Sequence, residues 1–181
     1  MKKTVIFIHG GGEGGYEADT KLADSLRKEL GANYEVHNPQ IHFNDALPDY
    51  GWLKQIEERI SLTSESLILV GHSFGASMLL KYLSENRIQK KIEGLFLIAP
   101  PFWSGNEDWV QPLKLWEGFS DKLPEGLPIF FYQCKDDDEI PFDHFMRYKE
   151  NIRWGVFREM AEGGHQLNND LSLVAKDIRS L

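Results

Sequence analysis

The sequence lacks the features that tie a chain to a membrane, to nucleic acid or to an oxidising compartment. Its single cysteine, Cys134, cannot form a disulfide within the chain. No apolar run reaches the roughly 20 residues that a membrane-spanning helix needs. Lys and Arg number 20 against 28 Asp and Glu, and the resulting net charge of -8 opposes binding to a phosphate backbone. We therefore expect a cytoplasmic protein without a membrane span or a nucleic-acid partner.

Internal repeats, low-complexity blocks and linker-like tracts are also missing, so the sequence predicts one domain over residues 1–181. A chain of this length buries roughly two thirds of the surface that its unfolded form exposes, which is enough for a single core. The apolar run after Lys3 ends at His9 and is too short for the hydrophobic region of a signal peptide. Oligomeric state has no signal in the sequence.

Apolar runs typical of buried parallel strands alternate with segments of helical periodicity. The first predicted helix has Ala18, Leu22, Leu26 and Leu30 on its apolar face. Strands are predicted at residues 4–9, 34–37, 66–70, 92–99, 127–133 and 154–160. Helices are predicted at residues 17–30, 51–63, 76–84, 142–150 and 171–180. This order predicts an α/β fold with a mostly parallel sheet of about six strands and helices on both faces.

The periodicity stops between residues 100 and 126, a length that is uncommon for a structureless loop in a compact domain. This segment contains Phe102 and three tryptophans, Trp103, Trp109 and Trp116. Because clustered rings can line an apolar cleft, we expect a lid or a substrate pocket that includes Phe102, Trp103 and Trp109. The alternative is that these rings pack over the edge of the sheet.

The segment Gly71-His72-Ser73-Phe74-Gly75 matches the G-x-S-x-G pattern and lies between a predicted buried strand and a predicted helix. The pattern places a serine on a strained turn, where the flanking glycines remove side chains that would collide. Ser73 is therefore the candidate nucleophile, and the N–H of Phe74 would face a developing oxyanion. In the alternative interpretation, Ser73 is only a helix N-cap.

A serine hydroxyl needs a base that accepts its proton, and His165 follows the last predicted strand in a glycine-containing loop. The imidazole in turn needs an acid, which Asp136, Asp137 or Asp138 could supply after the preceding strand. Both loops would lie at the carboxyl edge of the sheet, where such folds place their sites. The alternatives are a surface histidine and a solvated acidic turn.

The glycines after the first strand offer a second oxyanion donor, for which the N–H of Gly11 is preferred because glycine lets the backbone approach a substrate closely. A phosphate-binding loop is excluded, since no Lys-Ser or Lys-Thr pair follows the glycines. We expect His9 and His72 to support the first loop and the serine turn. Cys134 is expected to be a small buried hydrophobe.

Metal ligation is not predicted. The spacing of His37, His42 and Asp45 matches no familiar zinc arrangement, and the three adjacent aspartates lack the alternation and glycine of a calcium loop. The expected chemistry therefore calls for neither a metal nor another cofactor.

The chain contains a strand followed by His-Gly-Gly-Gly, then Gly-His-Ser-Phe-Gly, Asp-Asp-Asp-Glu-Ile-Pro and Gly-Gly-His, in this order. With these motifs it resembles the α/β-hydrolase superfamily over nearly its whole length. It is similar to the compact serine hydrolases related to retinoblastoma-binding protein 9 and YdeN, which lack the first strands of larger relatives. The resemblance implies a triad of Ser73, His165 and Asp137, the acid that lies four residues before Pro141, with Asp138 in reserve.

Partner binding does not carry over from the resemblance, because the chain has no Leu-x-Cys-x-Glu segment. The sequence thus predicts a serine hydrolase that acts on small carboxylic esters or related acyl compounds through an acyl-enzyme. Thioesters, peptides and lactones stay open as substrates. The alternative is a catalytically weak hydrolase fold that binds a ligand or a protein partner through the same cleft.

Overall fold

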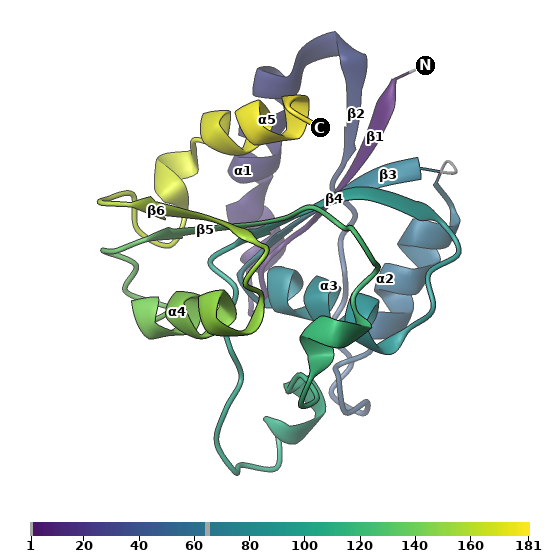
Figure 1. Cartoon of the computed structure of the whole chain (residues 1–181), viewed down its shortest axis with the longest axis vertical. Coiled ribbons are helices and arrows are strands. Elements are labelled where there is room, and N and C mark those ends of the chain that lie inside the picture. Colours follow the sequence, from purple (N-terminus) through teal and green to yellow (C-terminus); the bar gives the residue numbers. More distant parts are fainter. Residues whose placement is uncertain (1, 64–65) are drawn as a thin grey trace.

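The central sheet has six strands in the order β2-β1-β3-β4-β5-β6, and every neighbouring pair is parallel (Figure 1). The structure is a computed structural model that describes residues 2–63 and 66–181. The predicted parallel sheet is thereby confirmed. The strands are β1 (Lys3–Ile8), β2 (Tyr34–His37), β3 (Ser66–His72), β4 (Lys91–Ile98), β5 (Ile129–Cys134) and β6 (Val156–Met160).

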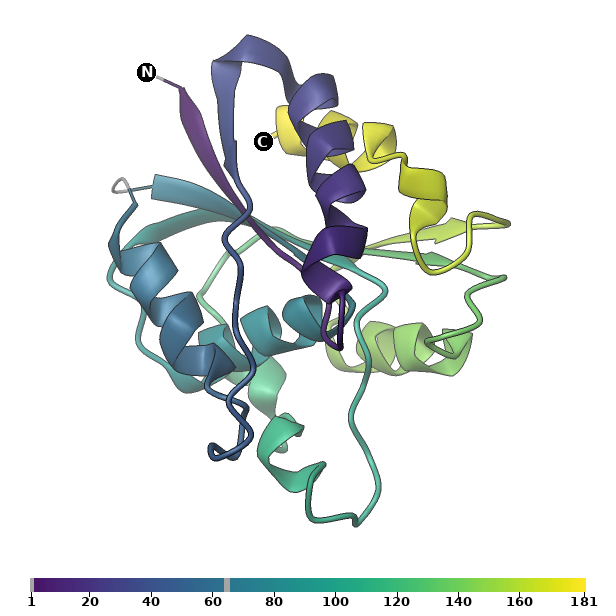
Figure 2. The ribbon, with the colours of Figure 1, turned by 180° about the vertical axis from the view of Figure 1, so that it is seen from behind.

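Helices cover both faces of this sheet, as predicted (Figures 1 and 2). One face carries α1 and α5, and the other carries α2, α3 and α4. No helix in the described ranges is long and apolar enough to cross a membrane. The helices are α1 (Gly15–Leu30), α2 (Trp52–Ser61), α3 (Ser73–Glu85), α4 (Phe142–Asn151) and α5 (Ser172–Arg179).

The strands are apolar without alternation because both of their faces are covered. In β1, Val5 and Phe7 pack toward α1 and α5, whereas Ile6 and Ile8 pack toward the opposite layer. All four side chains are almost fully buried. The sheet therefore separates two apolar clusters, and each strand contributes to both.

One expectation for α1 is wrong, namely that Ala18 lies on its buried face. Ala18 is exposed, and the buried face of the helix instead includes Asp19, Leu22, Ala23 and Leu26. These four residues follow the i, i+3, i+4, i+7 spacing of a helix face. The predicted Leu22, Leu26 and Leu30 are buried, and Asp19 takes the place expected for Ala18. A carboxylate is thereby placed in the interior.

The chain reverses direction of winding at β1, because β2 lies on one side of it and β3 on the other. Loops that leave the carboxyl ends of such neighbouring strands diverge and form a crevice between them. Here those loops contain Gly11 and Ser73.

In the segment over residues 100–126, Leu113 and Phe119 are buried in the cluster on the α2, α3 and α4 side, so this segment packs on the domain in part.

Candidate active site

Ser73 lies at the junction of β3 and α3, with a backbone φ of 48°. This left-handed conformation is strained for a residue with a side chain. Glycine is required at both flanking positions because a side chain there would collide with neighbouring backbone atoms. A Cβ atom on Gly71 would lie 2.7 Å from the Cα of Ala76, and one on Gly75 would lie 2.6 Å from the carbonyl oxygen of Ile8. The N-cap position of α3 is occupied by His72 and Ser73 is the first residue of the helix, so N-capping does not explain the serine.

His165 is paired with Asp137 from the loop after β5. The His165 Nδ1 lies 2.9 Å from Oδ2 and 3.1 Å from Oδ1 of Asp137, and only 5% and 1% of the two side chains are exposed. Because the carboxylate can only accept, Nδ1 carries the proton and Nε2 is the nitrogen that can accept another. Such a pair has the arrangement of a general base with its orienting acid.

The loop around Asp137 stabilises the charged carboxylate. Its Oδ1 accepts hydrogen bonds from the backbone N–H groups of Glu139 at 3.0 Å and Ile140 at 2.9 Å. Burial works against the charge, but the hydrogen bonds from His165 and from the two backbone groups outweigh it, so the pKa of Asp137 is below its ordinary value. The carboxylate is thus held ionised beside the imidazole.

The neighbouring aspartates occupy different places. Asp136 accepts hydrogen bonds from the backbone N–H groups of Gly163 at 3.1 Å and Gly164 at 2.9 Å. These bonds lower the pKa of Asp136 and fix the loop that leads to His165. Asp138 is exposed to solvent. Of the three aspartates, therefore, only Asp137 is paired with the imidazole.

The charges around His165 favour its protonated form. Burial lowers the pKa of the imidazole, but the hydrogen bond and charge of Asp137, together with the charges of Glu139 and Asp19, outweigh burial and raise it above the ordinary value. The Oε2 of Glu139 lies 3.7 Å from the His165 Nε2. This nitrogen is therefore well placed to hold a proton that it takes from a nearby donor.

Gly11 lies directly against the residue that follows the serine. A Cβ atom on Gly11 would be 2.9 Å from the Cβ of Phe74, so only glycine fits here. Both residues line one cavity together with Ser73. The structure thus brings the two predicted oxyanion donors to the same place as the predicted nucleophile.

A second buried acid–imidazole pair lies behind the serine turn, and sequence reasoning missed it. The Nδ1 of His72 lies 2.8 Å from Oδ2 of Asp19, and each side chain is only 1% exposed. Asp19 also accepts the backbone N–H of Gly10 at 2.6 Å and the Gln166 amide at 3.1 Å. The Nε2 of His72 lies 3.1 Å from the carbonyl oxygen of His165.

Both partners of His72 are acceptors, so the ring is held between the Asp19 carboxylate and the carbonyl oxygen of His165. Burial raises the pKa of Asp19, but the hydrogen bond and charge of His72 outweigh it and hold that pKa below the ordinary value. A correctly phased α1 would have put Asp19 on the buried face, which is the signal the sequence offered. The partner could not be inferred, since it lies 53 residues away along the chain.

Two cavities meet at Ser73. One, of about 290 Å³, is largely aromatic, and the other, of about 190 Å³, is polar. Both are also lined by Gly11. Other residues of the aromatic cavity are Gly12, Phe43, Tyr50, Phe74, Pro101, Trp103, Trp109, Leu113 and Ile140. Other residues of the polar cavity include Glu13, Asp19, His72, Glu139, His165 and Gln166.

Of the predicted pocket residues, Trp103 and Trp109 line the aromatic cavity, whereas Phe102 is not among its lining residues. The Phe102 ring packs against Tyr148 with centroids 5.0 Å apart, and its backbone N–H donates to the Nδ1 of His144 at 3.0 Å. The adjacent residues of this segment therefore face different surroundings. Phe43 and Tyr50, from the loop before α2, were missed because that loop has no periodicity.

His9 and Cys134 have contacts that fit a structural role, as the sequence predicts. The His9 Nε2 accepts the backbone N–H of Ile41 at 2.9 Å, and its Nδ1 donates to the carbonyl of Gly10 at 2.6 Å. Burial lowers the pKa of His9, which fits this neutral ring. Cys134 is buried, and burial together with the charges of Asp136 and Asp137 raises the pKa of its thiol to about 11. Such a thiol is a poor nucleophile at neutral pH.

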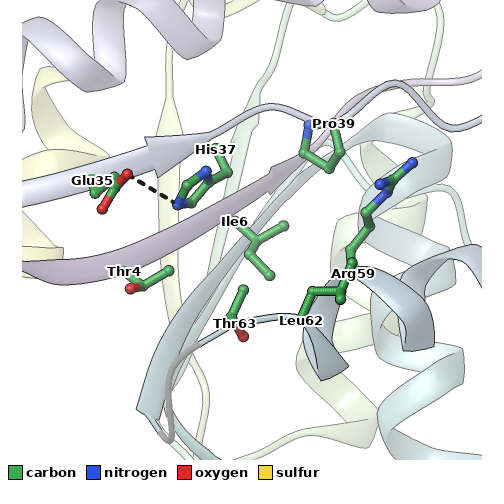
Figure 3. Close-up of a pocket in the computed structure, with 8 residues that line it drawn as sticks. All are labelled: Thr4, Ile6, Glu35, His37, Pro39, Arg59, Leu62 and Thr63. Carbon is green, nitrogen blue, oxygen red and sulfur yellow. Dashed lines mark ion pairs between the residues drawn. The ribbon is translucent and has the colours of Figure 1, made fainter.

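A larger cavity, of about 480 Å³, is lined by residues of β1, β2 and the end of α2, and Ser73 is not among them (Figure 3). Within it, Glu35 and His37 form an ion pair of 3.7 Å. None of the predicted catalytic residues lines this cavity, so its size does not make it the candidate active site. Among residues 2–63 and 66–181, no group of three or more His, Cys, Asp and Glu side chains could hold a metal ion.

Comparison with known sequences points to one family. Residues 18–170 match the family described as serine hydrolases. YdeN of Bacillus subtilis (strain 168), which bears a provisional hydrolase name, is 24% identical over 182 residues, covering 94% of this chain and 89% of YdeN.

Solved structures agree with this fold. The structure of YdeN has a TM-score of 0.71 at 21% identity and covers 99% of this chain and 98% of that one. A variant of the meta-cleavage product hydrolase CumD from Pseudomonas fluorescens IP01 has a TM-score of 0.77 at 16% identity, covering 100% and 92%. Est1E from Butyrivibrio proteoclasticus has a TM-score of 0.72 at 15% identity, covering 99% and 86%. At these identities the likeness shows an α/β-hydrolase fold alone.

Proposed function

This chain belongs to the serine hydrolase family, and on that premise we propose that Ser73 is the nucleophile of an esterase-type reaction on carboxylic esters or related acyl compounds. The observation that carries the proposal is the His165–Asp137 pair at 2.9 Å, which faces a cavity shared with the strained Ser73. The sequence motifs alone indicated the three residue types. The pairing supports the proposal with the contact expected between a base and its orienting acid.

In the proposed first step, the Ser73 Oγ attacks the carbonyl carbon while the His165 Nε2 accepts the hydroxyl proton. The carbonyl π electrons move to oxygen, and the N–H groups of Gly11 and Phe74 stabilise that oxyanion. Asp137 keeps the proton on Nδ1 and stabilises the imidazolium.

The tetrahedral intermediate then collapses. The bond to the leaving oxygen breaks as His165 gives its proton to that oxygen, which leaves an acyl group on Ser73. A water molecule attacks the acyl carbon with His165 again as the base. The carboxylic acid departs and the serine hydroxyl is restored, so no other co-reactant is needed.

A fluorophosphonate probe tests the nucleophile. We expect the probe to label the wild-type protein at Ser73, as mapped by peptide mass spectrometry, and Ser73→Ala to remain unlabelled. The same variant should lose hydrolysis of p-nitrophenyl butyrate by at least about 10³-fold, because the whole catalytic unit depends on the nucleophile. Labelling that persists in Ser73→Ala would contradict the proposal. A folded wild-type protein that neither reacts nor turns over would support a ligand-binding role.

The acid is tested by two neighbouring substitutions that remove the same charge. Asp137→Asn should lower kcat for p-nitrophenyl butyrate by about 10³- to 10⁴-fold, since the amide no longer fixes the His165 tautomer. Asp138→Asn is the matched control, and its kcat should stay within about twofold because Asp138 is exposed. Equal losses in the two variants would argue against Asp137 as the triad acid.

A further inference from the structure

The two cavities that meet at Ser73 differ in chemistry. The aromatic cavity is lined by the ring of Phe74 and by four further rings, those of Phe43, Tyr50, Trp103 and Trp109. The polar cavity is lined by glycine backbone and by several charged or amide side chains. A substrate attacked by Ser73 must extend from the scissile carbonyl in two directions, so each half of the substrate meets one of these surfaces.

Proton transfer decides which half enters which cavity. In the proposed reaction His165 protonates the leaving oxygen, so the leaving group must lie beside the His165 Nε2. His165 lines the polar cavity and is not among the residues that line the aromatic one. The leaving group therefore belongs in the polar cavity, and the acyl group belongs among the rings.

Apart from the buried Asp19–His72 pair, the carboxylate side chains that line the polar cavity are not matched by any Lys or Arg among the described residues there. Asp19 and His72 face each other at 2.8 Å, so the Asp19 carboxylate already has a buried partner. Glu13 and Glu139 remain, and no Lys or Arg is among the residues described as lining the cavity. Glu139 lies next to the position of the leaving group, since its Oε2 is 3.7 Å from the His165 Nε2.

We propose, building on the proposed function, that the substrate is an ester that joins an apolar or aromatic acyl group to a small polar alcohol, with a cationic alcohol favoured and an anionic one disfavoured. The apolar acyl group gains by leaving water for the ring-lined cavity. A cation on the alcohol gains from Glu13 and Glu139. The preference is moderate, because the Glu139 side chain is 66% exposed and solvent screens its charge.

The test uses three esters of 3-phenylpropanoic acid whose alcohols share a two-carbon spacer. The alcohols are choline, 3,3-dimethylbutanol and isethionate, so the head group is a cation, a neutral group of the same shape or an anion. The measured quantity is kcat/KM, which includes acylation, the step in which the alcohol leaves. We expect choline to exceed dimethylbutanol by about fivefold, and isethionate to fall below it by a similar factor. High salt should shrink both ratios.

The acyl side is tested with the dimethylbutyl esters of acetic and 3-phenylpropanoic acid. We expect the aromatic acyl group to be favoured by at least about tenfold in kcat/KM. Trp109→Ala should reduce this acyl preference and leave the charge ranking of the alcohols as it is. Trp116→Ala is the matched control, because Trp116 is 72% exposed and does not line the aromatic cavity.

Glu139→Gln should do the reverse, lowering the choline preference toward unity while the acyl preference persists. Glu150→Gln, on the exposed surface of α4, is its control and should keep both preferences. Effects that cross over, with Trp109→Ala changing the charge ranking, would overturn the assignment of the two cavities.

The outcomes separate this inference from the proposed function. Equal kcat/KM for all three alcohols, with p-nitrophenyl butyrate still hydrolysed in a Ser73-dependent manner, would overturn the inference and leave the proposed function standing. Failure of Ser73 to react with a fluorophosphonate, with no ester hydrolysed, would overturn both.

Discussion

In the proposed role of a base, His165 can act only when its Nε2 is free of a proton, and its surroundings favour the protonated form. The carboxylates of Asp137, Glu139 and Asp19 raise its pKa against the opposing effect of burial. Activity should therefore fall on the acid side at a pH above the ordinary histidine value of about 6.5.

The pH dependence of Glu139→Gln tests this cause. Removing a negative charge near Nε2 makes the imidazolium less stable, so the pKa of His165 falls and a larger fraction stays neutral at low pH. We expect the acid limb of kcat/KM for a neutral ester to move to lower pH by a few tenths of a unit, about the size of an exposed charge effect. Glu150→Gln should leave the limb in place. A shift to higher pH in Glu139→Gln would contradict the electrostatic account.

At the scale of single residues, the sequence was most informative where chemistry is local. The strained turn at Ser73 could be predicted because its flanking glycines are within two residues, and the crowding at Gly71 and Gly75 shows why glycine is needed there. The choice of Asp137 depended on a family interval, since three adjacent aspartates have no local difference. The His72–Asp19 pair could not be foreseen, because it depends on how α1 packs against the turn after β3.

The pair formed by Asp19 and His72 joins three separate elements of the fold. Asp19 projects from α1 and holds Gly10 in the loop after β1, while His72 ends β3 and contacts the carbonyl of His165. Gln166 adds a bond from the same loop as His165. The loops that carry Ser73, His165 and Gly11, the proposed nucleophile, base and oxyanion donor, are thus tied to one carboxylate.

Removal of that carboxylate tests the network. Asp19→Ala should lower the free energy of unfolding by about 3–5 kcal/mol, because it leaves the buried His72 imidazole and the Gly10 N–H without their shared acceptor. Asp24→Ala, on the exposed face of the same helix, removes only a surface ion pair with Arg27 and should cost less than about 1 kcal/mol. Urea denaturation at pH 7 compares the two. Similar small losses in both variants would show that the buried pair contributes little.

The helices and strands could be predicted wherever the apolar periodicity was clear and the residues that start or end the element were typical. Every predicted strand and helix is present, and β2 has the predicted bounds. The start of α3 was placed three residues late, at 76 and not 73, since a helix that begins within a strained turn has no ordinary start signal. Residues 100–126 combine packed apolar residues with pocket rings, a dual role that their irregular sequence does not reveal.

At the scale of the whole molecule, one sheet supports both apolar clusters. Adjacent residues of β5 belong to opposite clusters, with Phe131 toward the α2, α3 and α4 layer and Tyr132 toward α1 and α5. Because both layers pack on the same strands, the loss of either layer would expose one face of the sheet on which the other layer also depends. The chain should therefore behave as one domain, as its sequence predicts.

Unfolding measured from the two faces separately tests that expectation. Trp52 and the half-buried Trp103 pack on one face, and the other three tryptophans are already exposed. Cys134 is buried on the other face, so the change in tryptophan emission and thiol reactivity report different layers. In a urea titration, emission and pulse labelling of Cys134 by a thiol reagent should share one midpoint, because two-state unfolding exposes both layers together. Ser73→Ala, which leaves both layers intact, should also give coincident transitions. Labelling of Cys134 at clearly lower urea than the emission change would divide the molecule into two cooperative units.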